Sequence, residues 1–119
     1  MRSSWFVLGL MALAVGSTDA QQTRSILFIG NSFTFGSGSA VRFWRANTVT
    51  DLNEEGIGGV PALFKSFADQ TELPYDVYLE TRGGSAFDFH LREKLAEITS
   101  EAWDVGVAHS YSTLDRENP

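Results

Sequence analysis

After residue 21 the sequence alternates short apolar runs with longer amphipathic segments. Residues 26–29 form a continuous apolar run, which is typical of a strand buried on both faces of a parallel sheet. Residues 76–81 predict a second strand, and residues 104–108 predict a third that Gly106 weakens. These three runs are the expected strands of the domain.

Two amphipathic segments separate the strands. Residues 60–70 predict a helix, because Pro61 suits a first helical turn, where its missing N–H would have no partner. Apolar residues recur at helical spacing along it: Val60, Leu63, Phe64, Phe67 and Ala68. Residues 86–100 predict a second helix, with Ser85 as N-cap and Asp88 in a capping-box relation to it. The expected buried stripe of this helix comprises Phe87, Leu91, Leu95 and Ile98.

The order strand, helix, strand, helix, strand predicts an α/β fold with parallel strands and right-handed crossovers. Such a sheet would be incomplete. Either another element covers its open edge or the sequence is a piece of a longer protein, and we favour the second interpretation.

Residues 37–59 fit neither pattern. They contain the aromatic pair Phe43 and Trp44 and a cluster of glycines near residue 58. Long loops inside compact domains are often functional, so this segment could face a substrate. It could equally be a surface insertion whose two aromatic side chains pack on the core.

The composition is that of one globular domain. The chain has 119 residues, of which 43% are hydrophobic and 20% charged. The net charge of −6 argues against a nucleic-acid partner, which would require clustered Lys and Arg. The chain has no cysteine, which excludes disulfides, thiolate metal sites and a cysteine nucleophile. Two histidines nineteen residues apart lack zinc-ligand spacing, so we predict no metal and no cofactor.

The first twenty residues have the layout of a secretory signal. Arg2 is followed by an apolar run over residues 5–15, and Thr18 and Ala20 offer small side chains for cleavage before Gln21. The run is shorter than the roughly 18 residues of a membrane-spanning helix. We therefore predict a secreted or periplasmic protein with no membrane association after cleavage. An uncleaved anchor or a buried first helix is the alternative.

Ligands of open parallel sheets bind beyond the carboxyl ends of the strands. Three polar segments follow the predicted strands: Asn31-Ser32, Gly83-Gly84 and His109-Ser110. The expected topology brings them to one edge, where glycines allow backbone N–H groups to approach an oxyanion. Asn31, Gly83, His109 and Ser110 are candidate substrate-binding residues.

The segment from Ile26 to Thr34 reads Ile-Leu-Phe-Ile-Gly-Asn-Ser-Phe-Thr and resembles the first block of the SGNH/GDSL hydrolases. That block is a hydrophobic strand leading into Gly-Asp-Ser, with a Gly-Asn-Ser-Phe-Thr variant. The resemblance implies a three-layer, flavodoxin-like fold over residues 21–119. It also implies that Ser32 is the nucleophile and first oxyanion donor. The family's second block maps onto Gly83 or Gly84, of which Gly84 is preferred, and residues 103–107 resemble the strand before the third block.

The chain departs from the family pattern in two places. The third block ends in an asparagine, whereas residues 109–114 contain none, so His109, Ser110 or Ser112 would have to replace it. The family's C-terminal Asp-x-x-His is also missing, and a serine needs such a base to become nucleophilic. This chain alone is therefore expected to be inactive.

Neither histidine of the chain is an obvious substitute for that base. His90, on the predicted second helix, is expected to be structural, while His109 could bind substrate or polarise a carbonyl. Asp88 and Asp115 are expected to be solvated.

The leading hypothesis is an exported esterase or deacetylase that cleaves carboxylic esters, including acetylated carbohydrate, with a catalytic histidine beyond Pro119. A non-catalytic carbohydrate-binding module of the same fold is the alternative. A truncated product that does not fold stably is a third possibility.

Overall fold

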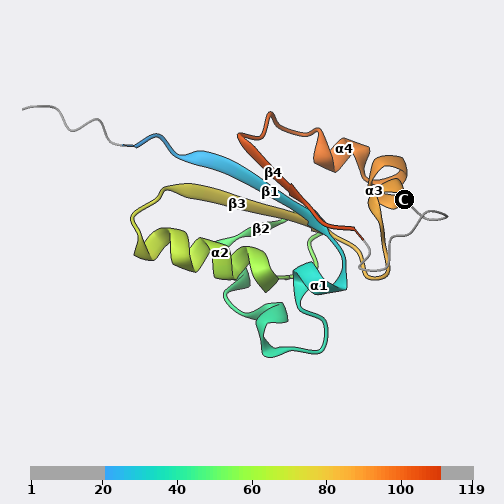
Figure 1. Ribbon diagram of the computed structural model, residues 1–119, viewed down its shortest axis with the longest axis horizontal. Helices are drawn as coiled ribbons and strands as arrows, with labels where there is room; N and C mark the ends of the chain where they lie inside the picture. The colour runs from blue at the N-terminus through green and yellow to red at the C-terminus, as the bar shows by residue number, and fades with distance from the viewer. Residues whose placement is uncertain (1–20, 111–119) are drawn as a thin grey trace, which may run out of the picture.

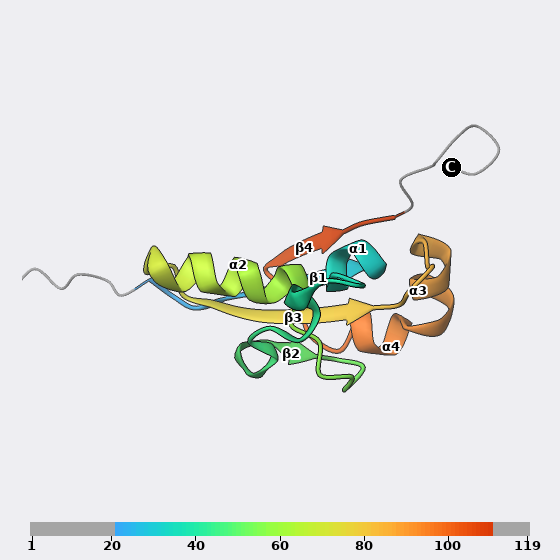
Figure 2. The same cartoon turned by 90° about the horizontal axis from the view of Figure 1, so that it is seen from below.

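The computed structural model describes residues 21–110, so the predicted signal segment and residues 111–119, which include Ser112 and Asp115, lie outside it. Four strands form one all-parallel sheet in the order β2-β3-β1-β4 (Figures 1 and 2). The strands are β1 (Arg24–Gly30), β2 (Thr50–Asp51), β3 (Tyr75–Thr81) and β4 (Val105–Ala108). The predicted α/β class, the parallel pairing and the three predicted strands are confirmed.

The central strand, β1, is the continuous apolar run of the sequence. It pairs with β3 on one side and β4 on the other. Ile26 and Phe28 face the same side of the sheet as Val77 and Leu79, and they form the hydrophobic core with Phe35 and Ile57. Leu27 points to the opposite face and is also buried. A strand buried on both faces needs this continuous apolar pattern.

The start of β4 is attached to the start of β1 by one carboxylate. Asp104 Oδ2 accepts hydrogen bonds from the N–H of Ser25 at 2.7 Å and from its hydroxyl at 3.2 Å. These two bonds, with a smaller contribution from Arg24, hold the pKa of Asp104 below its usual range. The Asp104 side chain thus helps to set the register of β4 against β1.

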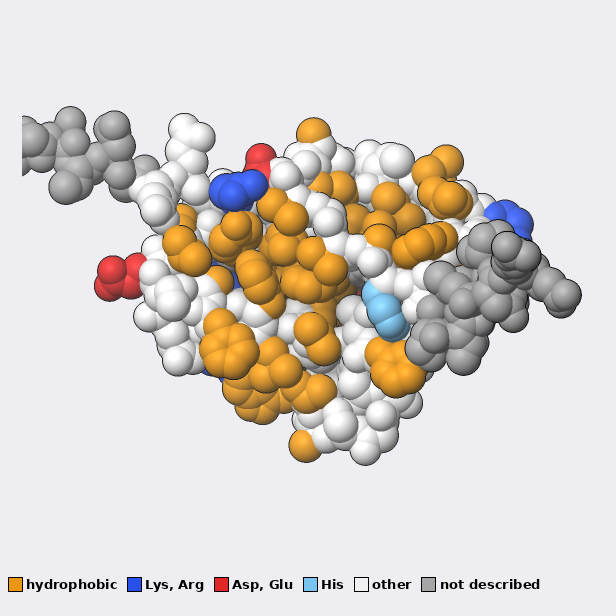
Figure 3. Space-filling view, viewed as in Figure 1, with side chains coloured by type: hydrophobic (Ala, Val, Ile, Leu, Met, Phe, Trp, Pro, Cys, Tyr) orange, Lys and Arg blue, Asp and Glu red, His pale blue; other side chains and the backbone are white. Residues whose placement is uncertain are grey.

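Helix α2 (Gly59–Gln70) covers the core face of the sheet and matches the predicted helix closely (Figure 1). The Phe64 ring lies 5.6 Å from that of Phe28 and 5.1 Å from that of Tyr75. Val60 and Phe67, however, are exposed. Figure 3 shows that apolar side chains gather on this side of the molecule, between α2 and β4.

The opposite face of the sheet is covered by two short helices, α3 (Phe87–Glu93) and α4 (Leu95–Ile98), rather than by the single helix predicted. The chain breaks between them at Lys94, whose φ of −126° is not helical. The N-cap is Ala86, without a side-chain bond, so the prediction of Ser85 as N-cap was wrong.

The prediction of a buried stripe on this helix was also wrong. Phe87 is 44% exposed, Leu91 61% and Leu95 52%. With Ile98, the first two of these residues line an open hollow above Ile29 and Ala108. The stripe therefore faces the sheet without packing closely on it.

The long segment before α2 is ordered by two 3₁₀ turns, η1 (Ala40–Phe43) and η2 (Ala46–Thr48), and by the unpredicted strand β2. Its contribution to the core is Ile57, which is buried. Phe43 and Trp44 are exposed, so the alternative in which they pack on the core was wrong. No helix within residues 21–110 is both long and apolar enough to cross a membrane.

Candidate active site

The three long strands end at the same edge of the sheet. Gly30, the last residue of β1, is paired with Thr81 of β3, and the N–H of Arg82 donates to the Gly30 carbonyl at 3.0 Å. On the other side of β1, the N–H of His109 donates to the Ile29 carbonyl at 2.9 Å. The segments that follow the strands therefore converge as the predicted topology requires.

Ser32 lies at this edge as the first residue of a short helix, α1 (Ser32–Phe35), and is partly exposed. The turn into α1 is tight, since a Cβ on Gly30 would lie 2.0 Å from Thr34 Oγ1. At the other end Gly36 adopts a left-handed conformation, and its N–H donates to the Ser32 carbonyl.

Asn31 connects the three segments at the edge. Its Oδ1 accepts from the Phe33 N–H at 3.1 Å and caps α1. Its Nδ2 donates to the Ser85 carbonyl and to the Ser110 carbonyl, each at 3.2 Å. The side chain is buried, and these three hydrogen bonds hold the segments together. Substrate binding by Asn31 stays a prediction from the sequence.

The diglycine segment joins β3 to α3. Gly83 and Gly84 are both exposed, and Gly84 has φ of +68°, which a residue with a Cβ rarely adopts. The turn closes behind them, where Ser85 donates to the Arg82 carbonyl from its N–H at 3.3 Å and from its hydroxyl at 2.7 Å. The Arg82 guanidinium stacks on the Phe89 ring at 5.5 Å and places a positive charge beside this turn.

His109 lies next to α1. Its Nδ1 is 3.5 Å from Thr34 Oγ1, and its ring meets that of Phe33 edge-on at 5.8 Å between centroids. His109 and Phe33 line, with Phe28, Thr34, Val60 and Val107, a shallow hollow of about 240 Å³. The predicted site residues Ser32 and His109 thus belong to neighbouring segments. Ser110 is buried, and its carbonyl receives the Asn31 bond described above.

Three buried residues beside this edge were not identified from the sequence as a group. Glu80, at 0% exposure, faces His90, at 1%, through His90 Nδ1. His90 Nε2 lies 2.8 Å from Ser85 Oγ, and Ser85 is 4% exposed. The expectation that His90 is structural agrees with its burial. Glu80 was the available signal, because a carboxylate next to the apolar residues of a predicted strand needs a partner if the strand is buried.

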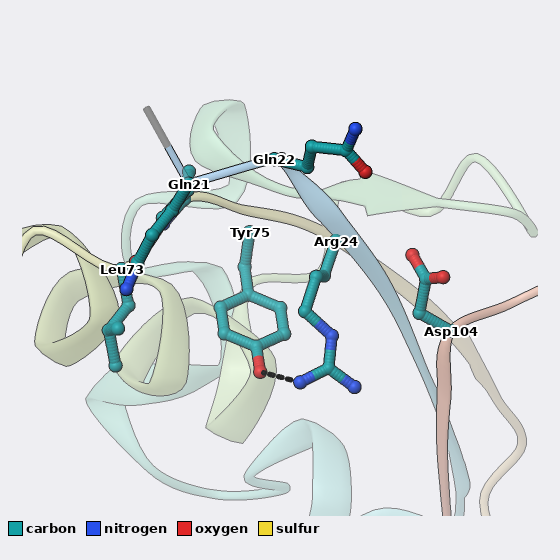
Figure 4. A pocket seen from close by; sticks show the side chains of 7 residues that line it. Gln21, Gln22, Arg24, Leu73, Tyr75 and Asp104 are labelled. Atoms are coloured by element: carbon teal, nitrogen blue, oxygen red, sulfur yellow. Dashed lines mark hydrogen bonds between the residues drawn. The ribbon is translucent and has the colours of Figure 1, made fainter. Parts of the chain in front are cut away.

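A larger hollow, of about 480 Å³, lies at the opposite edge, where the strands begin. Figure 4 shows Arg24 and Tyr75 there, with the Arg24 guanidinium 3.4 Å from the Tyr75 hydroxyl. Asp104 lines the same hollow. This edge of a parallel sheet is not the one where ligands bind. Within the described residues no three His, Asp or Glu side chains lie close enough together to hold a metal ion.

Comparisons of the chain with protein-family models, with curated proteins and with solved structures found no significant match. The functional assignment therefore depends on the geometry of the edge that contains Ser32.

Proposed function

We propose that the chain is the N-terminal part of an exported SGNH/GDSL-type serine hydrolase with a flavodoxin-like fold, and that it cleaves carboxylic esters. The order of the three long strands, β3-β1-β4, supports this proposal, because a flavodoxin-like sheet also places its first strand between its second and third. In such sheets the ligand lies where successive connections leave the first strand in opposite directions. Ser32 and His109 follow the two strands that meet there.

The single observation on which the proposal depends is the bracing of the Ser32 turn by Asn31. Because the Asn31 amide donates to Ser85 and Ser110, the nucleophile segment is tied to the diglycine turn and to the segment after β4. Preorganised groups of this kind are the main source of catalysis by electrostatic stabilisation.

In the proposed reaction Ser32 Oγ attacks the ester carbonyl carbon and forms an acyl-enzyme. The hydroxyl proton passes to a histidine C-terminal to Pro119 and then to the leaving alcohol. The backbone N–H groups of Ser32 and Gly84 stabilise the oxyanion. Water then hydrolyses the acyl-enzyme. In this proposal His109, which lies beside Phe33, contacts the substrate.

The test uses protein expressed from the complete reading frame. Hydrolysis of a p-nitrophenyl ester series, from acetate upward, is compared between the parent and Ser32→Ala. The proposal predicts that Ser32→Ala loses nearly all activity, while the matched variant Ser100→Ala, at an exposed position before β4, keeps it. Equal rates for the parent and Ser32→Ala would remove Ser32 from the mechanism.

A carbohydrate-binding module is the second candidate, and one observation favours it. Phe43 and Trp44 are exposed, and arginine guanidinium groups stack on them: Arg42 on Phe43 at 5.0 Å and Arg45 on Trp44 at 5.4 Å. Exposed rings held in this way could stack on sugar rings. Glycan binding that persists in Ser32→Ala and is lost in Trp44→Ala, with no ester hydrolysis by the complete protein, would support this candidate.

A further inference from the structure

The three buried residues near the diglycine turn form a connected chain of polar groups. The Glu80 carboxylate accepts from Asn53 Nδ2 at 3.0 Å through Oε1, and it contacts His90 Nδ1 through Oε2. His90 Nε2 then meets Ser85 Oγ. Burying a carboxylate and an imidazole is unfavourable unless their polar atoms are paired, and here each of these atoms has a partner. This series of polar groups connects the segment before α2, through β3 and α3, to the diglycine turn.

The order serine, histidine, carboxylate is also that of a catalytic triad, so Ser85 could be regarded as a second nucleophile. Hydrogen-bond accounting argues against it. A serine hydroxyl has one proton to donate, and the Ser85 hydroxyl lies 2.7 Å from the Arg82 carbonyl, to which it donates. His90 Nε2 must then donate to Ser85 Oγ, whereas a catalytic base would take the serine proton. The burial of Ser85 also keeps its oxygen away from an ester substrate.

Ser85 is instead held from two sides. Its hydroxyl is fixed by His90 and by the Arg82 carbonyl, and its own carbonyl accepts the Asn31 amide at 3.2 Å. Ser85 directly follows Gly84, a residue type with little conformational restraint of its own. The position of Gly84 relative to Ser32 therefore depends on how firmly Ser85 is held.

We propose that Glu80 and His90 are positioning residues for the oxyanion-stabilising turn, acting through the hydroxyl of Ser85. The inference rests on the proposed function, because it concerns the donor at Gly84 for a reaction at Ser32. His90 orients the Ser85 hydroxyl, and Glu80 orients the His90 ring. Apolar side chains could fill the same space, but they would not hold the hydroxyl.

The test measures kcat and KM separately in the complete enzyme for Ser85→Ala, Glu80→Ala and Glu80→Gln, with Ser100→Ala as the matched control. Ser85→Ala keeps the backbone carbonyl that Asn31 uses and removes the hydroxyl. We expect its kcat to fall roughly 10- to 100-fold with little change in KM, since a small displacement of a transition-state donor has an effect of this order. Ser100→Ala should match the parent.

Glu80→Gln separates the positioning role from a catalytic one. The glutamine amide can donate to His90 Nδ1 and accept from Asn53, which leaves His90 Nε2 as a donor to Ser85 Oγ. A positioning role therefore predicts that Glu80→Gln keeps most of the activity that Glu80→Ala loses. A triad centred on Ser85 predicts a loss of about 10⁴-fold for Glu80→Gln, because the histidine would be fixed in the wrong tautomer.

The outcomes separate the two proposals. If Ser32→Ala is inactive while Ser85→Ala and Glu80→Ala match the parent in kcat, the positioning role is wrong and the proposed function stands. If Ser32→Ala is fully active, the proposed function fails and the positioning role fails with it. If Ser85→Ala or Glu80→Ala does not fold, the near-isosteric Glu80→Gln decides alone: retained kcat supports positioning, and a loss as large as that of Ser32→Ala overturns it.

Discussion

The Asn31 brace makes a testable prediction about a nearly isosteric change. In Asn31→Asp the oxygen that caps α1 is retained, but the NH₂ group that donates to the Ser85 and Ser110 carbonyls is replaced by a second oxygen. A buried carboxylate would then face two carbonyl oxygens, so we expect a large loss of stability at neutral pH.

The magnitude follows from the two lost bonds. A buried acceptor left without a donor costs about 1–3 kcal/mol, so the two carbonyls together give about 2–6 kcal/mol. A domain of this size unfolds with a free energy of about 5–15 kcal/mol, so the variant would lose a large share of its stability. The matched variant Asn47→Asp, at an exposed position, should change the unfolding free energy by less than about 0.5 kcal/mol.

The loss in Asn31→Asp should depend on pH. The surrounding carbonyls and the burial disfavour the charged form of the introduced carboxyl, so its pKa in the folded state is raised above the unfolded value of about 3.9. The penalty is therefore full above the raised pKa and shrinks as the pH falls through it. Asn31→Ala also loses the two donors but introduces no titrating group, so its deficit should stay constant.

Urea unfolding at neutral and mildly acidic pH measures these differences in unfolding free energy. It can be followed by the fluorescence of Trp103, whose ring packs against that of Tyr78. Two results would refute the reasoning. One is an Asn31→Asp variant as stable as Asn47→Asp at neutral pH. The other is an Asn31→Asp deficit that does not shrink, relative to that of Asn31→Ala, as the pH falls.

Three further predictions concern stability. Leu79→Ala, in the core, should lower the unfolding free energy by about 2–5 kcal/mol, whereas the exposed Leu95→Ala should change it by less than about 0.5 kcal/mol; equal effects in urea unfolding would contradict the observed burial. Gly30→Ala should cost about 1–3 kcal/mol, because its Cβ would meet a side chain of α1, while Gly106→Ala, with open space around it, should have little effect on the thermal midpoint. Asp104→Asn should be less stable than the parent at neutral pH, because the pKa of Asp104 is lowered in the folded state. This difference in stability should disappear as the pH falls below about 3.9 and through the lowered pKa. A difference in the thermal midpoint that stays constant during an acid titration would count against this prediction.

The strands and the site edge could be predicted because their signals are local. The continuous apolar run of β1 is hard to place anywhere except in the middle of a parallel sheet, and the alternation of elements then fixes which ends of the strands meet. Pro61 at the start of α2 marks the helix boundary for the same kind of reason, since it restricts the backbone of its own turn.

The misplaced features depend on contacts between distant residues. Helical spacing of Phe87, Leu91 and Leu95 defines a face, but whether another element packs on that face is not encoded in the spacing. The strand β2 has two residues and no apolar pattern, and its existence depends on the edge of β3. These features were decided by tertiary packing.

The candidate site also contains features with a local sequence signal and features that depend on distant residues. Ser32 could be proposed as a site residue from the sequence because its local sequence is distinctive. The role of Asn31 as a brace was missed, because its partners, Ser85 and Ser110, are 54 and 79 residues away. The series of polar contacts that joins Glu80, His90 and Ser85 was missed for a related reason. Glu80 lies on β3, His90 on α3 and Ser85 in the turn between them, so no local pattern in the sequence indicates that their side chains meet.

The central claim, that Ser32 is the activated hydroxyl at this edge, is tested most directly by covalent labelling. The complete protein is treated with a fluorophosphonate, which reacts with activated serines, and then digested with trypsin. Cleavage after Arg24 and Arg42 releases Ser32 on the peptide 25–42, whereas cleavage after Arg82 and Arg92 releases Ser85 on the peptide 83–92. We predict one adduct, located by fragmentation at Ser32. An adduct on the peptide 83–92, or unchanged labelling in Ser32→Ala, would contradict the account.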